Sequence, residues 1–143
     1  MMASQQNGER MRVMIVEQDL DFGMKLADWL AAHGYQPVFV RTVDAAIDGL
    51  SGFRPQVVFI GLGWSAPAAQ TDMVEILLLI QTISPCTPVI MMADQTSEDL
   101  TQVLFRQGAR RFLIKPVEFS QVSEVLQSEL SAAMVELASC GTT

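Results

Sequence analysis

The sequence predicts an α/β fold in which helices cover both faces of a doubly wound, five-stranded parallel sheet. Strand and helix patterns alternate five times along the 143 residues, which is typical of a parallel sheet with crossover helices. The first and third predicted strands are apolar after their first residue, as expected where both faces of a sheet are buried. No repeat or low-complexity tract interrupts this order. We therefore expect one open sheet of strand order 2-1-3-4-5, with the first and last helices on one face and the other three opposite.

Length and composition agree with a single domain. At 143 residues the chain can bury one hydrophobic core but is too short for two. Half of its residues are hydrophobic and 17% are charged, which excludes the class of intrinsically disordered proteins. We expect a flexible tail over residues 1–10, the domain over 11–138 and a second tail over 139–143.

Apolar periodicity defines the first strand and the first helix. Arg12–Val16 is a β-branched run, which is typical of a buried strand. In Asp21–His33 the apolar side chains recur at helical spacing, and Gly34 ends the helix. Either Asp19 or Asp21 is expected to cap its first turn.

The middle of the chain repeats this alternation. A short second strand, Pro37–Val40, precedes a helix over about Val43–Leu50 that ends in the turn-forming pair Ser51-Gly52. The third strand, Gln56–Ile60, is again apolar after its first residue and should lie in the centre of the sheet. The breaker-rich segment Gly61–Pro67 then predicts a loop.

The last five elements follow the same rules. The two strands are short apolar runs, and the three helices show apolar residues at helical spacing or an acidic first turn. In chain order they are the helix Gln70–Ile83, the strand Thr87–Met92, the helix Ser97–Gln107, the strand Arg111–Ile114 and the helix Phe119–Ala138. Because the carboxyl ends of parallel strands meet at one edge of a sheet, any functional site should lie there.

Charge and cysteine content restrict the function classes. The net charge of -7, from 16 acidic and 9 basic residues, argues against a nucleic-acid site and against binding to an anionic membrane. No apolar run approaches the roughly 20 residues of a membrane helix. Cys86 and Cys140 match neither a zinc spacing nor a redox motif, so we expect two free thiols and a cytoplasmic protein.

Six short motifs occur along the chain in a characteristic order. They are Val13–Glu17, His33–Tyr35, Pro55–Ile60, Pro88–Met92, Gly108-Ala109 and Lys115-Pro116. With these motifs, the chain from Met11 to about Leu137 resembles the receiver domains of bacterial two-component response regulators. The resemblance implies the flavodoxin-like receiver fold and a part in phosphorelay signalling.

The resemblance also implies a site at the strand ends. It would consist of an acidic pair after the first strand, an acceptor aspartate after the third, a serine or threonine after the fourth and a lysine after the fifth. In this chain the corresponding positions hold Glu17 and Gln18, Gly61, Ala93, and Lys115. Of these residues, Glu17 and Lys115 alone retain the expected chemistry.

The replaced residues change what the site can do. Gly61 has no carboxylate, so an acyl phosphate cannot form there, and we assign no phosphorylation site and no catalytic residue. With Gln18 in place of an acid, Glu17 is the one formal carboxylate ligand left, so Mg²⁺ binding should be weak or absent, and we expect no other metal or cofactor. Ala93 lacks the hydroxyl that would follow a phosphoryl group. Lys115 is expected to pair with Glu17, although a lysine that still serves a binding cleft is the alternative.

The predicted helix over 70–83 has more apolar residues than one core stripe needs. The residues expected in the stripe are Met73, Ile76, Leu77, Ile80 and Ile83. This leaves Val74, Leu78 and Leu79 off that face, where they would form an exposed contact surface unless the preceding loop covers them.

Three residues near the fifth strand are further candidates for a contact surface. Phe112 stands at the aromatic position that reports the switch in the receiver family, although an apolar ring in a strand is more often plain packing. Arg110 and Arg111 stand where many members of that family carry acids. An acidic partner would explain this change, and a solvated pair without a partner is the explanation we favour.

The favoured hypothesis is a non-enzymatic pseudo-receiver that works through protein contacts. It would bind a protein partner or a second copy of the chain through its fourth helix, fifth strand and fifth helix. The alternative is a conventional phosphoacceptor that uses a displaced aspartate, namely Asp19, Asp72 or Asp94. A nucleotide or cofactor binder of the same fold is a third hypothesis, against which the absence of a phosphate-binding loop argues.

Overall fold

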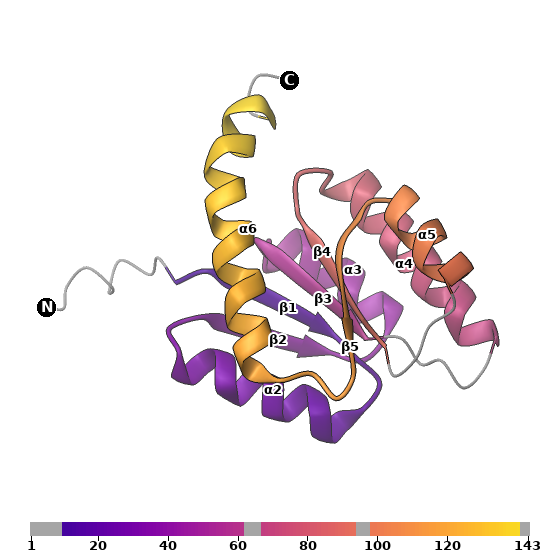
Figure 1. Ribbon diagram of the computed structural model, residues 1–143, viewed down its shortest axis with the longest axis horizontal. Helices are drawn as coiled ribbons and strands as arrows, with labels where there is room; N and C mark the ends of the chain where they lie inside the picture. Colours follow the sequence, from indigo (N-terminus) through magenta and orange to yellow (C-terminus); the bar gives the residue numbers. More distant parts are fainter. Residues whose placement is uncertain (1–9, 62–66, 94–97, 141–143) are drawn as a thin grey trace, which may run out of the picture.

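A parallel sheet lies between two layers of helices in the computed structural model, which describes residues 10–61, 67–93 and 98–140 (Figure 1). The strands are β1 (Arg12–Val16), β2 (Gln36–Val40), β3 (Val57–Gly61), β4 (Val89–Ala93) and β5 (Ala109–Ile114). Their order in the sheet is β2-β1-β3-β4-β5, and each neighbouring pair is parallel. The predicted fold class and strand order are therefore confirmed.

The helices lie close to their expected positions. They are α2 (Leu20–Ala32), α3 (Val43–Gly52), α4 (Pro67–Ile83), α5 (Glu98–Arg106) and α6 (Phe119–Cys140). Pro67, which we expected in the loop, begins α4, because the first helical position needs no backbone N–H. The last helix continues past its expected end at Ala138, and in Figure 1 its C-terminal part extends beyond the sheet.

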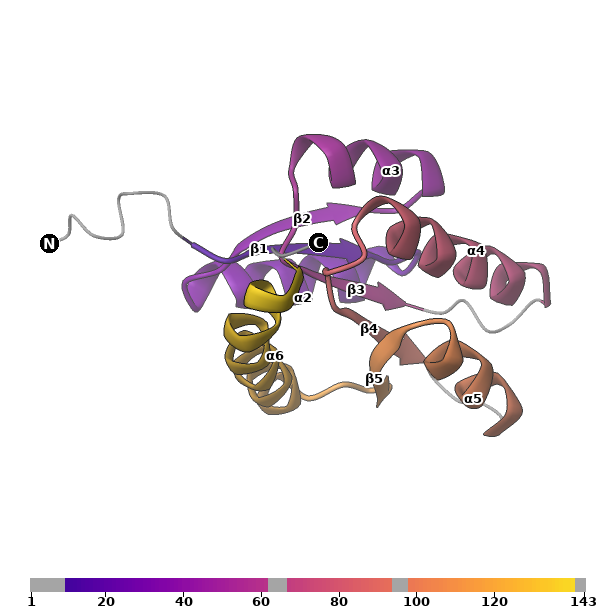
Figure 2. The same cartoon turned by 90° about the horizontal axis from the view of Figure 1, so that it is seen from above.

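Each face of the sheet has its own hydrophobic core. Along β1, alternate side chains belong to opposite cores, as the two-residue period of a strand requires. One core contains Val13, Ile15, Leu26, Leu30, Val122 and Leu126, and the other contains Met14, Val16, Leu50, Ile80 and Leu104. Thus α2 and α6 cover one face, whereas α3, α4 and α5 cover the other, as predicted (Figure 2).

Of the five residues expected in the core stripe of α4, three are confirmed and one is wrong. Ile76, Leu77 and Ile80 are buried in the core. Ile83 is 44% exposed, so its assignment to the core is wrong. It is the last residue of α4, where the helix ends. The side chain of Met73 lies outside the described part of the structure.

Two further expectations concern cysteine chemistry and membrane insertion. Cys86 is disulfide-bonded, so the prediction of a free thiol is wrong for this residue. The pattern of cysteines along the sequence contained no local motif that indicated this bond.

Across the described residues, no helix combines the length and the apolarity that crossing a bilayer requires.

Candidate functional site

The carboxyl edge of the sheet brings together the residues that we expected at the site. Glu17 directly follows β1, Gly61 ends β3, Ala93 ends β4 and Lys115 directly follows β5. The parallel register of neighbouring strands places these ends side by side. Gln18 is adjacent to Glu17 but is exposed to solvent.

The predicted ion pair between Glu17 and Lys115 is present. Lys115 Nζ donates to Glu17 Oε1 over 2.7 Å. The side chain of Glu17 is 2% exposed and that of Lys115 is 11% exposed. Water therefore solvates neither charge well, and each charge depends on the other for stabilisation. The ammonium group also lies 4.9 Å from the centroid of the Phe22 ring, within the range of a cation–π interaction.

Glu17 also forms hydrogen bonds through its second carboxylate oxygen and through its backbone N–H. Glu17 Oε2 accepts a hydrogen bond from the backbone N–H of Asp19 at 3.1 Å. The backbone N–H of Glu17 donates to the carbonyl of Val40 at 3.1 Å. The carboxylate lies so close to Gly61 that a Cβ atom added there would overlap it. Glu17 therefore occupies the space in which a side chain at position 61 would begin.

Ala93 and Gln18 contribute backbone atoms to this edge. The carbonyl of the fully buried Ala93 accepts from the backbone N–H of Lys115 at 2.6 Å. The carbonyl of Gln18 accepts from Arg41 Nη2 at 2.8 Å. Within the described ranges, no three acidic, histidine or cysteine side chains gather closely enough to hold a metal ion.

A small cavity of about 180 Å³ adjoins the site on the side of β2 and α3. Its walls include the polar residues Glu17, Gln18, Arg41 and Thr42. Thr42 is already used as the N-cap of α3, where its side chain accepts from the N–H of Ala45. Sequence reasoning missed Arg41, although its position directly after β2 places it at the carboxyl edge.

Of the three aspartates in the alternative hypothesis, Asp19 alone has a described side chain. Asp19 is the N-cap of α2, and its Oδ1 accepts from the backbone N–H of Phe22 at 3.2 Å. One of the two expected caps is thereby confirmed. Asp72 lies within α4, but its side chain is outside the described part of the structure, and so is all of Asp94.

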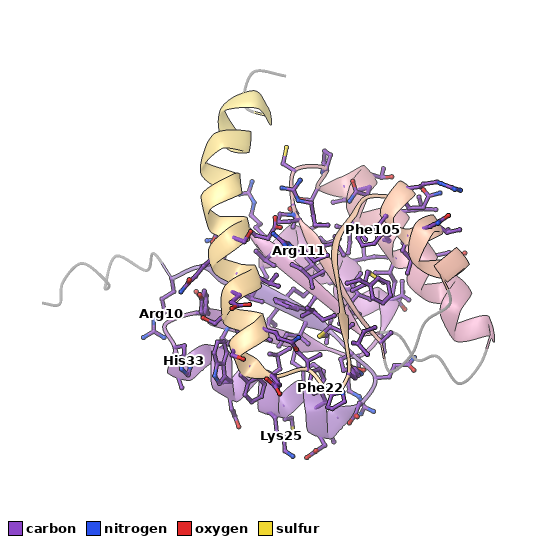
Figure 3. All side chains as sticks on the ribbon, in the orientation of Figure 1. Arg10, Phe22, Lys25, His33, Phe105 and Arg111 are labelled. Carbon is purple, nitrogen blue, oxygen red and sulfur yellow. The ribbon has the colours of Figure 1, made fainter. Side chains whose placement is uncertain are left out.

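Arg110 and Arg111 both bind Glu129 of α6. Their Nε atoms lie 3.1 Å and 3.3 Å from its two carboxylate oxygens, and the side chain of Glu129 is only 5% exposed. Arg111 also donates to Ser128 Oγ, and Figure 3 shows Arg111 between β5 and α6. Both arginines are exposed, as expected for a solvated pair, but they also bind an acid of their own chain, because the buried Glu129 needs cations nearby. Glu129, an acid within the apolar face of α6, was the missed signal.

Apolar side chains are exposed near β5 and on two helices of the same layer. Phe112 is half-buried, and its ring meets the ring of Phe105 edge to face, with centroids 6.3 Å apart. Phe105, which sequence reasoning missed, is 44% exposed on α5 (Figure 3). On α4, Leu78 and Leu79 are 43% and 36% exposed, as the apolar pattern predicts, whereas the side chain of Val74 lies outside the described part.

Comparisons with known proteins agree with this fold, although no family model matches the chain. The transcriptional regulatory protein ZraR of Klebsiella oxytoca is 27% identical over 125 residues, which cover 87% of this chain and 27% of ZraR. The chemotaxis protein CheY of Treponema pallidum is 23% identical over 130 residues, which cover 87% of this chain and 85% of CheY. The chain thus spans about a quarter of the length of ZraR but most of the length of CheY.

A solved structure shows the same architecture. The response regulator receiver domain protein from Methanospirillum hungatei, which is CheY-like, superposes with a TM-score of 0.80 at 17% identity. The superposition covers 90% of this chain and 99% of that one. This chain thus has the fold of a response regulator receiver domain.

Proposed function

We propose that the chain is a response regulator receiver domain that signals through protein contacts without accepting a phosphoryl group. The observation that carries this proposal is the state of position 61. Gly61 offers no nucleophile, and the Glu17 carboxylate, paired with Lys115, fills the space beside it. A phosphoryl group would therefore have neither an acceptor nor room at this position.

The other site residues support the same proposal. Mg²⁺ is a hard cation that carboxylates and phosphoryl oxygens hold, and Gln18 supplies a neutral amide where an acid is expected. Both oxygens of Glu17 already accept hydrogen bonds, and Lys115 is bound to one of them. The buried methyl group of Ala93 has no hydroxyl with which to report a bound phosphoryl group.

We place the contact surface on α5, β5 and α6. Val103, Phe105 and Ile114 are 38%, 44% and 49% exposed there, which favours an apolar partner. Arg110 and Arg111 do not argue for an acidic partner, because Glu129 of the same chain already binds both. A second copy of the chain or another protein with an apolar face would fit this surface.

Intact mass spectrometry tests the absence of phosphorylation. We expect the mass to stay unchanged after incubation with acetyl phosphate and Mg²⁺, under conditions that modify a conventional receiver domain run in parallel. A stoichiometric phosphoryl adduct would overturn the proposal. Asp19→Asn, Asp72→Asn and Asp94→Asn would then show which displaced aspartate accepts the group.

Sedimentation equilibrium tests self-association through the proposed surface. We expect a monomer–dimer equilibrium that Phe105→Ser weakens about tenfold or more, because an exposed aromatic ring is the best candidate for an interface anchor. Met24→Ser is the matched control, since Met24 is 52% exposed on α2, which covers the opposite face of the sheet. A chain that stays monomeric at all concentrations would exclude the second copy, and equal effects of the two substitutions would exclude this face.

A further inference from the structure

Glu17 and Gly61 stand at the ends of neighbouring strands and compete for one volume. The three atoms nearest to a Cβ built on Gly61 are Oε1, Cδ and Oε2 of Glu17, and they lie closer than real Cβ contacts allow. The side chain from the end of β1 therefore reaches across to the end of β3. It places its carboxylate where a side chain of residue 61 would otherwise begin.

The need for glycine at this position comes from space and not from backbone conformation. The described glycines with positive φ are Gly34 and Gly108, and Gly61 is not one of them. A backbone with ordinary φ accepts any residue whose side chain has room. At position 61 the room is taken by the Glu17 carboxylate, which is 2% exposed and cannot move into solvent without losing its partners.

We infer that Glu17 and Gly61 form a reciprocal lock, in which the carboxylate from β1 replaces the missing side chain on β3 and glycine is required to admit it. Through Lys115 the lock holds the connection that follows β5, and through the N–H of Asp19 it holds the start of α2. Both connections are thereby fixed with no phosphoryl group. Glu17 is a positioning residue here, and an aspartate placed at position 61 alone would displace it instead of creating an open site.

Thermal unfolding of the full chain tests the lock. We expect Gly61→Ala to lower Tm by roughly 4 °C or more, because the added methyl group overlaps the Glu17 carboxylate, which Lys115 and the N–H of Asp19 hold in place. Gly52→Ala is the matched control, since a Cβ at Gly52 meets nothing within 4 Å, and its Tm should stay the same or rise.

The identity of the obstructing group is tested by repeating Gly61→Ala in two backgrounds. In Glu17→Ala, which removes the carboxylate, the added methyl group should lower Tm little. In Glu17→Gln, which keeps the size and removes the charge, the loss should persist. Equal losses in the wild-type and Glu17→Ala backgrounds would overturn the inference.

The inference can still be tested if the Gly61→Ala variant does not fold. If Gly61→Ala alone is unfolded, Glu17→Ala combined with Gly61→Ala should fold with a Tm near that of Glu17→Ala, and an unfolded double variant would overturn the lock. Glu17→Ala combined with Gly61→Asp should be more stable than Glu17→Ala combined with Gly61→Asn, because Asp returns a carboxylate to Lys115. Equal stability of these two variants would show that a carboxylate at position 61 does not pair with Lys115. It would contradict the inference that the Glu17 carboxylate replaces a side chain at position 61.

Discussion

Glu17 connects three separate parts of the chain through its carboxylate and its backbone N–H. The carboxylate binds Lys115 after β5 and the N–H of Asp19 at the start of α2, and its backbone binds the carbonyl of Val40 on β2. A carboxylate that is 2% exposed is stable only when such partners replace its lost hydration. At the scale of residues, the site thus depends on one acid that serves several neighbours.

The Glu17–Lys115 pair should show strong coupling in a double-mutant cycle. We expect Lys115→Met to lower the free energy of unfolding by about 2 to 4 kcal/mol, because it leaves a buried acid without its cation. Combining it with Glu17→Gln should recover much of this loss, as measured by chemical denaturation. The exposed pair Lys25–Asp21 is the control, and Lys25→Met should cost less than about 1 kcal/mol. Strictly additive effects of the two substitutions at the site would show that the residues do not interact.

At the scale of elements, an ionic contact fastens α6 to β5. Glu129 lies on the buried face of α6, and its two carboxylate oxygens bind Arg110 and Arg111 of β5. The same helix also packs against the sheet through apolar residues such as Val122 and Leu126. Apolar burial holds the helix to the sheet without direction, whereas paired hydrogen bonds fix its position along the strand.

Loss of the Glu129 charge should destabilise the fold more than loss of a neighbouring exposed charge. We expect Glu129→Gln to lower the free energy of unfolding by about 2 kcal/mol, because the buried carboxylate that binds both guanidinium groups loses its charge. Glu124→Gln is the matched control on the exposed side of α6 and should change stability by less than about 0.5 kcal/mol. Urea denaturation of both variants measures the difference. Similar values for the two would mean that the apolar contacts alone fix α6.

At the scale of the whole molecule, the two hydrophobic cores share a single sheet. Met14 and Ile15 are neighbours on β1 but belong to opposite cores. Neither helix layer can leave without exposing the strands that also support the other layer. The chain should therefore behave as one cooperative unit.

Unfolding should accordingly take place in one transition. We expect far-ultraviolet circular dichroism and tryptophan fluorescence to give coincident denaturation curves, as two-state unfolding requires. The two signals distinguish the layers in a Trp64→Phe variant, in which the remaining Trp29 lies on α2 and packs against Phe119 of α6, whereas helices of both layers contribute to the dichroism. Separate midpoints for the two signals would show that one layer unfolds independently.

The sequence by itself determined the fold class, the strand order and the residues at the carboxyl edge, because strand and helix periods are local patterns and parallel strands end on the same side. It also indicated that Lys115 would pair with Glu17, since two opposite charges at that edge need each other. Only the tertiary structure decided that the Glu17 carboxylate occupies the space beside Gly61 and that Glu129 binds both arginines. These contacts join side chains from separate elements, and their geometry depends on side-chain reach and on how α6 lies against β5. Ile83 was misjudged for the same reason, because periodicity identifies a helix face but not where the neighbouring elements stop covering it.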